Sequence, residues 1–336
     1  MKIKKVFIGI DVSKEKLDLC VQIGDLISQE IVLLNTISEL KKFFRKFFKE
    51  HNAEDILLCC EHMGHYVYPL CCVCEDLNLD LWIENPYQIK HSSGLQRGKN
   101  DKVDARRIVE YAIRYQDKVR LFSLPDKNIS SLRILISERD LYVTHRSTYQ
   151  GQLSDQERFM SRSDFAAKSK RLKTLITDLD DFISAIDEHI NELLENDVTL
   201  SEQHKLLCSI DGVGSKTATK MIATTNAFRD FDNGRSFCCY VGVAPFEYTS
   251  GSSVRSKNRV SQKADKNIKA LLHLCALAAA INKKDSDLRD YYLRKVAEGR
   301  NKMSVLNAVR GKLILRMFAV IRDNRMYDRN YAAGFG

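Results

Sequence analysis

Four carboxylic acids stand at positions in the sequence where a fold can bring them together. Asp11 directly follows a short apolar run, and Glu61 directly follows another. Asp101 and Asp104 are three residues apart at the start of an expected helix, so both side chains share one face of it. Strand ends in an α/β sheet meet at one edge, so we expect the four acids to converge there. Taken singly, each also fits a helix cap or a solvated loop.

Converging carboxylates create a requirement for positive charge. Buried like charges repel one another and lose solvation, and a divalent cation removes both costs. Hard oxygen ligands select Mg²⁺, or Mn²⁺ in its place. Two such ions about 4 Å apart activate an attacking oxygen and stabilise a leaving one in phosphoryl transfer. The four acids therefore predict metal-assisted chemistry on phosphate esters.

Positive charge is concentrated beside these acids and in a second region towards the C-terminus. The chain carries 53 Lys and Arg against 44 Asp and Glu, a formal net charge of +9. Residues 90–120 hold nine basic and four acidic residues, and residues 251–270 hold six and one. Such patches bind phosphates without reading base sequence. The expected nucleic-acid contacts are Arg97, Lys99, Lys102, Arg106, Arg107, Arg255, Lys257, Arg259, Lys263 and Lys266.

The elements that must position the acids form an α/β region over residues 1–125. Apolar runs indicate buried strands, one run that alternates apolar and polar residues indicates a half-buried strand, and helical apolar stripes separate them. The pattern predicts an antiparallel three-strand meander extended by crossover strands. Strands are expected over residues 6–10, 17–23 (the half-buried one), 27–34, 56–60 and 79–83, and helices after a capping box at Thr36 and over residues 66–77 and 102–116.

Residues 126–200 are expected to form long helices. Seven apolar residues follow the 4,3,4,3 spacing of a coiled-coil seam, and residues 172–197 hold one basic residue against eight acidic ones, a net −7. The seam packs either inside its own chain or between subunits, and we favour a helical hairpin or coiled coil that joins subunits. The seam residues are Leu172, Ile176, Leu179, Ile183, Ile186, Ile190 and Leu193.

Residues 201–330 form a third, mainly helical region. Asp211-Gly212-Val213-Gly214 lies between two apolar helical patterns. It resembles the hairpin of helix-hairpin-helix modules, whose backbone N–H groups meet phosphate, and it also fits a tight helix–helix turn. The tail from residue 327 onward is expected to fray.

Composition excludes several classes of protein. With 44% hydrophobic and 29% charged residues and only 4 Pro, the chain is neither disordered nor collagen-like. Its 10 Cys are too sparse for a disulfide-stapled secreted domain, and adjacent pairs inside apolar runs indicate buried, reduced thiols. The longest apolar stretch, residues 271–281, is about half a membrane span. We therefore expect a cytoplasmic protein with no membrane role.

Three acidic motifs resemble those of the bridge-RNA-guided insertion-sequence transposases, a family that includes Piv-type DNA invertases. They are FIGIDVSK around Asp11, CCEHMGHY around Glu61, and GKNDKVDARRI around Asp101 and Asp104. The resemblance implies an N-terminal RuvC-like (RNase H-fold) domain over residues 1–125, with the four acids as a DEDD metal tetrad.

The rest of the chain resembles the same family in the same order. The family places a coiled coil next, here residues 126–200, and then a C-terminal transposase domain carrying a serine, here residues 201–330. The segment YVGVAPFEYTSGSS resembles the one that holds this serine and puts it at Ser250. Thr249, Ser252 and Ser253 are adjacent, so beyond the resemblance the choice of hydroxyl stays open.

The function implied is site-specific recombination that moves a mobile insertion sequence in a bacterial or archaeal cell, at the nucleoid. A noncoding bridge RNA would pair with donor and target DNA, and Ser250 would attack a DNA phosphate with help from the metal-bound tetrad. The cations that follow the serine would hold that phosphate. The active form would be a homo-oligomer, a dimer or tetramer joined through the coiled coil.

Three alternatives stay open at this point. A RuvC-like junction-resolving nuclease needs the acids alone. A non-catalytic architectural or RNA-binding protein would use the carboxylates only to shape its fold. An actin-like sugar kinase also has an Asp after its first strand, but DVSK lacks the glycines of a phosphate-binding hairpin.

Overall fold

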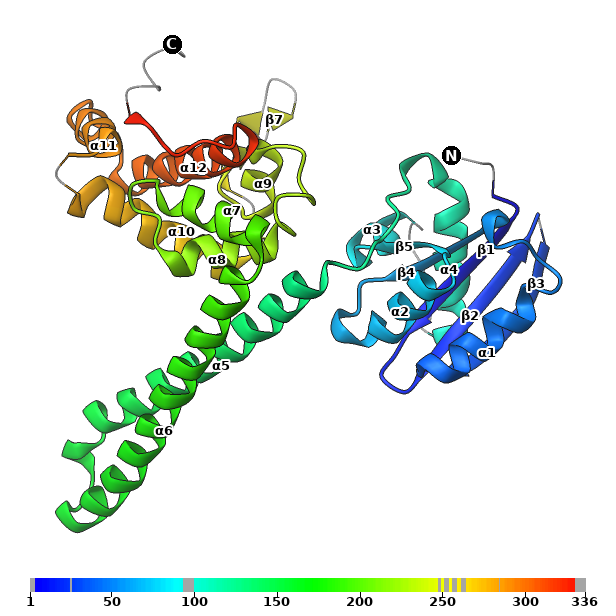
Figure 1. The fold of residues 1–336 in the computed structure, drawn as a ribbon, viewed down its shortest axis with the longest axis horizontal. Coiled ribbons are helices and arrows are strands. Elements are labelled where there is room, and N and C mark those ends of the chain that lie inside the picture. The colour runs from blue at the N-terminus through cyan, green and yellow to red at the C-terminus, as the bar shows by residue number, and fades with distance from the viewer. Residues whose placement is uncertain are drawn as a thin grey trace. The chain divides into compact units, whose positions relative to one another are not determined.

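The computed structural model divides the chain into two compact units (Figure 1). Unit 1 is Met1–Leu124 and unit 2 is Pro125–Gly336, and each is described by itself. The predicted boundary after residue 125 lies beside this division, while the one after residue 200 falls inside unit 2 and stays a prediction. The structure describes residues 4–24, 26–92, 100–246, 249–250, 254–255, 259–260, 264–283 and 285–329.

Unit 1 is built on a five-stranded mixed sheet with the order β3-β2-β1-β4-β5. The first three strands form the antiparallel meander that the sequence predicts, and β4 and β5 join β1 in parallel through helical crossovers. The α/β character of this region is therefore confirmed. The strands are β1 (Val6–Val12), β2 (Lys16–Ile23), β3 (Leu26–Leu34), β4 (Ile56–Glu61) and β5 (Asp80–Glu84).

Helices cover both faces of this sheet. On one face, α1 (Ile37–Phe47) and α2 (Tyr68–Asp76) pack on the even-numbered residues of β1. On the other, α4 (Asp101–Arg114) packs on the odd-numbered residues and on Trp82. We call this second side the α4 face. The short helix α3 is Pro86–Ser92, and 3₁₀ turns cover Ala53–Asp55, Gly64–Val67 and Gln116–Lys118.

Strand β2 departs from the prediction of a half-buried strand. Its alternate polar positions were expected to meet solvent, yet Asp18 is 4% exposed and Cys20 is fully buried. The reason is α4, which packs on β2 as well as β1 and places Cys20 in the core of the α4 face. A strand with helices on both sides buries both of its faces.

Unit 2 begins with two long helices, α5 (Lys127–Asp155) and α6 (Arg162–Glu195), which pack together as a hairpin (Figure 1). The predicted seam lies on one side of α6 and shares a core with Ile129, Leu132 and Ile136 of α5. Acids of α6 also pair with α5, because Arg139 donates to Asp187 at 2.6 Å and Arg146 lies 2.6 Å from Asp180. The seam thus packs within its own chain, the alternative we did not favour, and a role between subunits stays a prediction.

The rest of unit 2 is a mainly helical cluster around one hydrophobic core, which includes Phe237, Leu313 and Met317. Among the described residues, no helix is both long and apolar enough to span a bilayer. The helices are α7 (Val198–Cys208), α8 (Ser215–Thr224), α9 (Gly234–Tyr240), α10 (Lys266–Leu277), α11 (Asp287–Ala297) and α12 (Lys302–Arg322), with a 3₁₀ turn at Glu157–Phe159 and a π turn at Ala278–Asn282. The strands are β6 (Pro245–Phe246), which pairs with β9 (Arg259–Val260), and β7 (Thr249–Ser250), which pairs with β8 (Val254–Arg255).

Candidate active site

Helix α4 brings its first turn to the end of β1 because the strand has no side chain at the point of contact. Gly9 lies two residues before Asp11 and on the same face of the sheet. A Cβ at Gly9 would lie 2.3 Å from the Ala105 carbonyl oxygen and 2.4 Å from the Val109 nitrogen. Only glycine allows so close an approach of helix to strand. The approach carries Asp101 and Asp104, both in the first turn of α4, towards Asp11.

The pKa of Asp11 is raised by burial and by the acids around it. Burial raises its pKa, and the charges of Asp101, Asp104 and Asp18 raise it further, to about 6. The Lys16 ammonium opposes the shift. Three of the four predicted acids therefore interact in unit 1. We call the set Asp11, Asp18, Asp101 and Asp104 the acidic cluster.

Asp18 and Lys16 belong to this site, although neither was among the predicted site residues. Asp18 stands directly opposite Asp11 in the β1–β2 pairing. The Lys16 ammonium lies 2.9 Å from a carboxylate oxygen of Asp18 and 2.9 Å from one of Asp101, so it ties β2 to α4. A signal was present in the sequence: Lys16 and Asp18 occupy the same alternating positions of β2, which point to one face of the sheet.

Glu61, the fourth predicted acid, ends β4 beside Asp11. The parallel pairing of Ile10 with Cys60 puts Asp11 and Glu61 next in register, at the same edge and on the same face. Glu84 ends β5 in register with Glu61 and was also missed. Its carboxylate accepts hydrogen bonds from the Tyr111 hydroxyl at 3.1 Å and from the Asn85 backbone N–H at 2.7 Å. The strand ends thus form a row of three acids.

The donors at this edge fit a hard divalent cation in type and in charge. All are carboxylate oxygens, the kind of ligand that Mg²⁺ and Mn²⁺ prefer. Burial and the charges of Asp101, Asp104 and Asp18 raise the pKa of Asp11 despite the single ammonium of Lys16, and a bound cation would relieve both causes. Across the part of the chain that the structure describes, however, no three His, Cys, Asp or Glu side chains are already arranged to hold a metal ion.

The predicted cations of unit 1 differ in their surroundings. Lys102 is exposed in the first turn of α4. Arg106 pairs with Glu30 of β3, and Arg107 donates to Asp104 at 2.7 Å, so both are engaged within the fold. Arg97 and Lys99 lie outside the described residues.

The predicted serine segment is described only in part. The backbone of Ser250 lies in β7, where Ser250 pairs with Val254 and Thr249 with Arg255. Lys266 is exposed at the start of α10, where Asp265 caps the helix by accepting from two backbone N–H groups. Ser252, Ser253, Lys257 and Lys263, and the side chains of Thr249, Ser250, Arg255 and Arg259, lie outside the described part.

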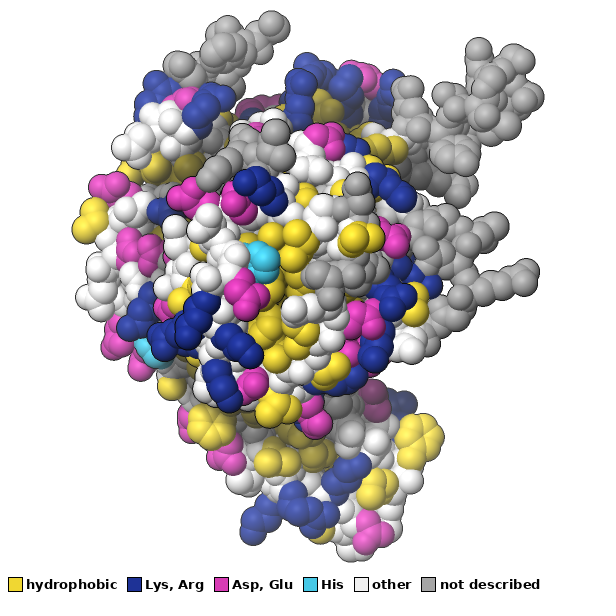
Figure 2. Space-filling model, turned by 90° about the vertical axis from the view of Figure 1, so that its right-hand side faces the viewer, with side chains coloured by type: hydrophobic (Ala, Val, Ile, Leu, Met, Phe, Trp, Pro, Cys, Tyr) yellow, Lys and Arg dark blue, Asp and Glu magenta, His cyan; other side chains and the backbone are white. Residues whose placement is uncertain are grey.

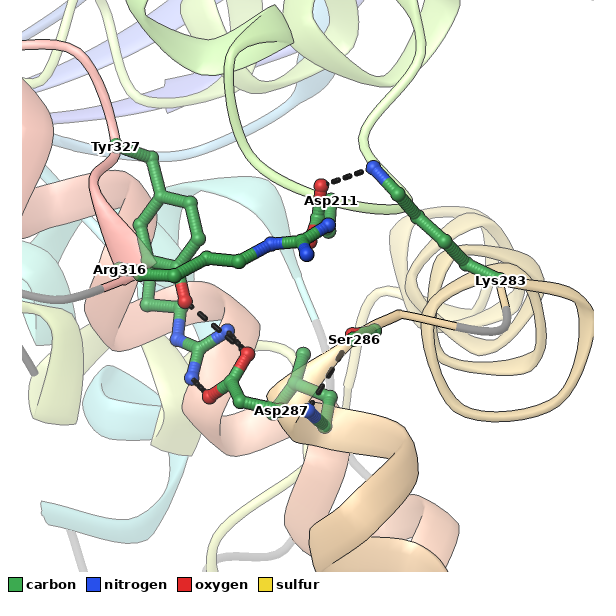
Figure 3. Close-up of polar contacts among 8 residues, drawn as sticks. Asp211, Lys283, Ser286, Asp287, Arg316 and Tyr327 are labelled. Carbon is green, nitrogen blue, oxygen red and sulfur yellow. Dashed lines mark hydrogen bonds and ion pairs between the residues drawn. The ribbon is translucent and has the colours of Figure 1, made fainter.

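The Asp211-Gly212 turn between α7 and α8 is closed by packing and by ion pairs. Gly212 has φ +86°, and a Cβ there would lie 2.7 Å from the Cys275 carbonyl oxygen. Asp211, 8% exposed, forms an ion pair with Lys283 (Figure 3). It forms a second ion pair with Arg329, whose guanidinium lies 2.8 Å away. These contacts account for the turn as a tight helix–helix connection.

The start of the C-terminal tail is held in place, contrary to the expected fraying. The Tyr327 N–H donates to the Ser209 hydroxyl at 2.8 Å, and its own hydroxyl donates to Asp287 at 3.1 Å. Arg316 pairs with the same Asp287 and lies over the Tyr327 ring (Figure 3). The expectation of a frayed tail is therefore wrong for residues 327 and 329, because polar contacts anchor them.

Comparison with known families assigns the chain to a class. Residues 8–156, which include the whole predicted tetrad, match the DEDD transposase model of IS110-type elements. Residues 204–293 match the transposase family of IS116, IS110 and IS902. The chain belongs to this family of insertion-sequence transposases, which are enzymes of DNA recombination.

Two kinds of relative illustrate the likeness. The pilin gene-inverting protein of Moraxella bovis is 24% identical over 333 residues, which cover 97% of this chain and 98% of that protein. Its counterpart in Moraxella lacunata is 24% identical over 335 residues, with the same coverage. An uncharacterized 43.6 kDa protein of insertion element IS110 from Streptomyces coelicolor is 27% identical over 166 residues, covering 48% of this chain and 40% of that protein.

Proposed function

We propose that this chain is a metal-dependent recombinase that cuts and rejoins DNA at specific sites to move or invert a DNA segment. The observation that carries the proposal is the approach of Asp101 and Asp104 to Asp11, at an edge that Glu61 shares. The sheet order, with an antiparallel meander extended by parallel strands and α4 across one face, supports a RuvC-like domain. The Moraxella relatives are named for inverting a gene, which agrees with site-specific recombination.

The acids have a distinct role in this proposal. Asp11, Glu61, Asp101 and Asp104 would hold one or two divalent cations, Mg²⁺ or Mn²⁺. A bound cation of this kind supplies Lewis-acid polarisation of phosphate oxygens. The row of strand ends orients the carboxylates, and the close contact at Gly9 fixes the distance between α4 and β1. Glu84 and Tyr111 support the row from its outer end.

Ser250 is the proposed nucleophile. Its Oγ would attack a DNA phosphorus, so that an Oγ–P bond forms while the bond from phosphorus to the leaving sugar oxygen breaks. In the assembled complex, where the tetrad and the serine would meet within or between subunits, a tetrad carboxylate would take the hydroxyl proton and pass it to the leaving sugar oxygen. Arg255, Lys257, Arg259, Lys263 and Lys266 would neutralise the charge that develops on the phosphate. The support is the family membership and the position of Ser250 in the serine motif.

A trapped covalent complex tests this mechanism. Wild-type protein with Mg²⁺ and element-end DNA should give a protein–DNA adduct that Ser250→Ala lacks. Asp11→Asn and Asp104→Asn should abolish strand cleavage while folding and DNA binding persist. Asp76→Asn is a matched control, because its side chain is 53% exposed and lies on α2, on the face opposite α4. An adduct that persists in Ser250→Ala rejects the serine assignment.

A nuclease that uses the acids alone is the second candidate. The observation that favours it is that all four acids lie in one compact unit. In that case the wild-type chain would form no adduct, and Ser250→Ala would cleave DNA at the wild-type rate. Comparison of wild type with Ser250→Ala therefore separates the two functions.

The partners proposed are donor DNA, target DNA and a noncoding bridge RNA. Support comes from the net charge of +9 and from the exposed Lys102 and Lys266 near the proposed chemistry. A structured noncoding RNA transcribed beside the gene should copurify with the wild-type chain, and its sequence should be complementary to the element ends and a target. Recovery of no such RNA from an active preparation would reject guidance.

A homo-oligomer joined through the α5–α6 hairpin is also proposed. The seam is occupied within the chain, so the support now comes from other apolar side chains on the hairpin: Leu141 is 52% exposed, Phe182 54% and Phe159, at the tip, 85%. In sedimentation equilibrium the wild-type chain should be a dimer or tetramer, and the Phe159→Ser/Phe182→Ser variant should shift towards monomer. An unchanged mass would place the interface elsewhere.

A further inference from the structure

An open hollow borders the acidic cluster on the α4 face of the sheet. It is about 560 Å³ in volume and is formed by the turn at residues 13–16 and the end of β3 at residues 32–34. Three apolar residues belong to its lining: Leu33, which is buried in the core of the opposite face, and the exposed Val32 and Leu34, at 53% and 62% exposure. Figure 2 views the molecule from the side where β3 lies in Figure 1 and shows apolar side chains gathered near the middle of that face, with charged ones around them.

The register of the sheet places this hollow beside the proposed chemistry. Asp11 pairs with Asp18, and Asp18 pairs with Val32, so the three share one rank across β1, β2 and β3. Strands lie about 5 Å apart, which puts Val32 about 10 Å from Asp11. Lys16 pairs in register with Leu34, and its ammonium marks the border by binding Asp18 and Asp101.

The turn that forms one wall is already rigid. The Ser13 hydroxyl donates to the Lys16 carbonyl at 2.8 Å, and the Ser13 N–H donates to the same oxygen at 3.0 Å. Asn35 donates from its side chain to the Ser13 carbonyl at 2.9 Å and from its backbone to the Glu15 carbonyl at 2.9 Å. The hollow is therefore preformed, as binding sites for small groups usually are.

The chemistry of the hollow matches a nucleotide. Val32 and Leu34 offer an apolar floor for the face of a base. Lys14 is exposed on the rim and forms no ion pair within the described part of the chain, so its ammonium is available to a phosphate. A nucleic-acid strand that places one phosphate at the acidic cluster has a neighbouring base within reach of this floor.

We propose that this hollow is a subsite for an unpaired nucleotide next to the phosphate that reacts, with Val32 and Leu34 against the base and Lys14 on the adjoining phosphate. The inference rests on the proposed function, because it is the acidic cluster that brings the strand here. It adds a role for residues outside the tetrad: they hold the strand open and in register beside the acids.

The test measures binding of a short fluorescein-labelled single-stranded DNA to the full chain by anisotropy, in Ca²⁺ in place of Mg²⁺, over a series of NaCl concentrations. Val32→Thr/Leu34→Thr puts a β-branched side chain, which suits a strand, at both positions and removes much of the apolar surface. It should weaken binding about five- to tenfold at every salt concentration, because the bound base then buries less apolar surface. Lys14→Gln should instead lower the salt dependence, by about 0.7 in the slope of log K against log salt.

Leu26→Thr is the matched control, because Leu26 is 76% exposed on the same strand but at its far end, paired with Ile23. It should bind DNA like wild type. The proposal is overturned if Val32→Thr/Leu34→Thr binds like wild type, if Leu26→Thr weakens binding equally, or if the wild-type chain binds no DNA. A change in oligomer mass with unchanged binding would assign the surface to a second copy instead.

These outcomes are separate from the test of the proposed function. Normal recombination by Asp11→Asn would remove the catalytic role of the acids and leave the binding results intact. Conversely, loss of recombination in Asp11→Asn together with unaltered DNA binding in Val32→Thr/Leu34→Thr would remove only the subsite.

Discussion

Gly9→Ala tests how the fold positions its acids. The added Cβ would lie 2.3 Å from the Ala105 carbonyl oxygen and 2.4 Å from the Val109 nitrogen, both of which are backbone atoms of α4. Ordinary contacts of this kind are longer than about 3 Å, so α4 must move away from β1 by roughly 1 Å. Neither atom belongs to a side chain that can rotate away. The displacement is therefore passed to the first turn of the helix, where Asp101 and Asp104 lie.

The expected effects follow from that displacement. Overpacking a core costs about 1 to 3 kcal/mol, and replacing a strand glycine with alanine returns about 0.5 to 1 kcal/mol. Unit 1 should therefore lose about 1 kcal/mol of unfolding free energy, within a range of about 0 to 2.5 kcal/mol. A misplacement of about 1 Å at reacting groups lowers rates on the order of 100-fold. Strand cleavage should fall by that factor under conditions where the variant is fully folded.

The single tryptophan makes the stability measurement specific. Trp82 is 2% exposed, lies in the core of the α4 face and contacts the Tyr111 ring with 5.2 Å between centroids. Denaturation followed by its fluorescence therefore reports on unit 1. Gly151→Ala in α5 is the control, because a Cβ there meets nothing within 4 Å, and it should leave the Trp82 transition unchanged. A wild-type midpoint and cleavage rate for Gly9→Ala would refute the reasoning, and lost stability with full activity would show that α4 does not position the acids.

Three further substitutions probe the charges. Asp11→Asn should raise the melting temperature in EDTA at pH 7.5 and match wild type below pH 4. The pKa of Asp11 in the folded protein, about 6, exceeds the ordinary 3.8, so the wild type loses stability as pH rises from 3.8 to about 6. The neutral amide of the variant does not titrate and avoids this loss. Lys16→Gln should raise the pKa of Asp11 further, because the ammonium lowers it, and should shift the pH midpoint of cleavage upward; an unchanged midpoint would contradict the role of Lys16. Asp211→Asn should destabilise unit 2 by about 2 kcal/mol in calorimetry, since it leaves Lys283 and Arg329 without their shared partner, and a wild-type melting curve would show that the turn needs no charge.

Local patterns in the sequence were enough to predict much of unit 1. Apolar runs and alternation fixed the five strands to within a few residues, because side chains in a strand alternate between the faces of its sheet. Asp11 and Glu61 could be placed at one edge since each follows such a run directly. Asp101 and Asp104 could be placed together because they are three residues apart at the start of an expected helix, which the structure confirms with Asn100 as its N-cap.

The sequence could not predict which element packs against each polar or apolar face. Asp18 has the pattern of a solvent-facing strand residue, and it becomes a buried member of the acidic cluster only because α4 crosses β2. The seam of α6 has the same spacing whether its partner is α5 or another subunit. In both cases a residue pattern defines an apolar or polar face, while long-range packing decides what covers it.

The link formed by Lys16 explains how so much negative charge can collect at one edge before any cation binds. Its ammonium contacts Asp18 and Asp101 directly and lowers the pKa of Asp11, which burial and the charges of Asp101, Asp104 and Asp18 together still raise. The fold thus compensates part of the charge, and the remainder adds to the effect of burial on the pKa of Asp11. A cluster neutralised completely by lysines would have little affinity for a divalent cation, and one without Lys16 would push α4 away from the sheet. We therefore expect the arrangement to favour a cation at Asp11 while Lys16 keeps Asp101 within reach of it.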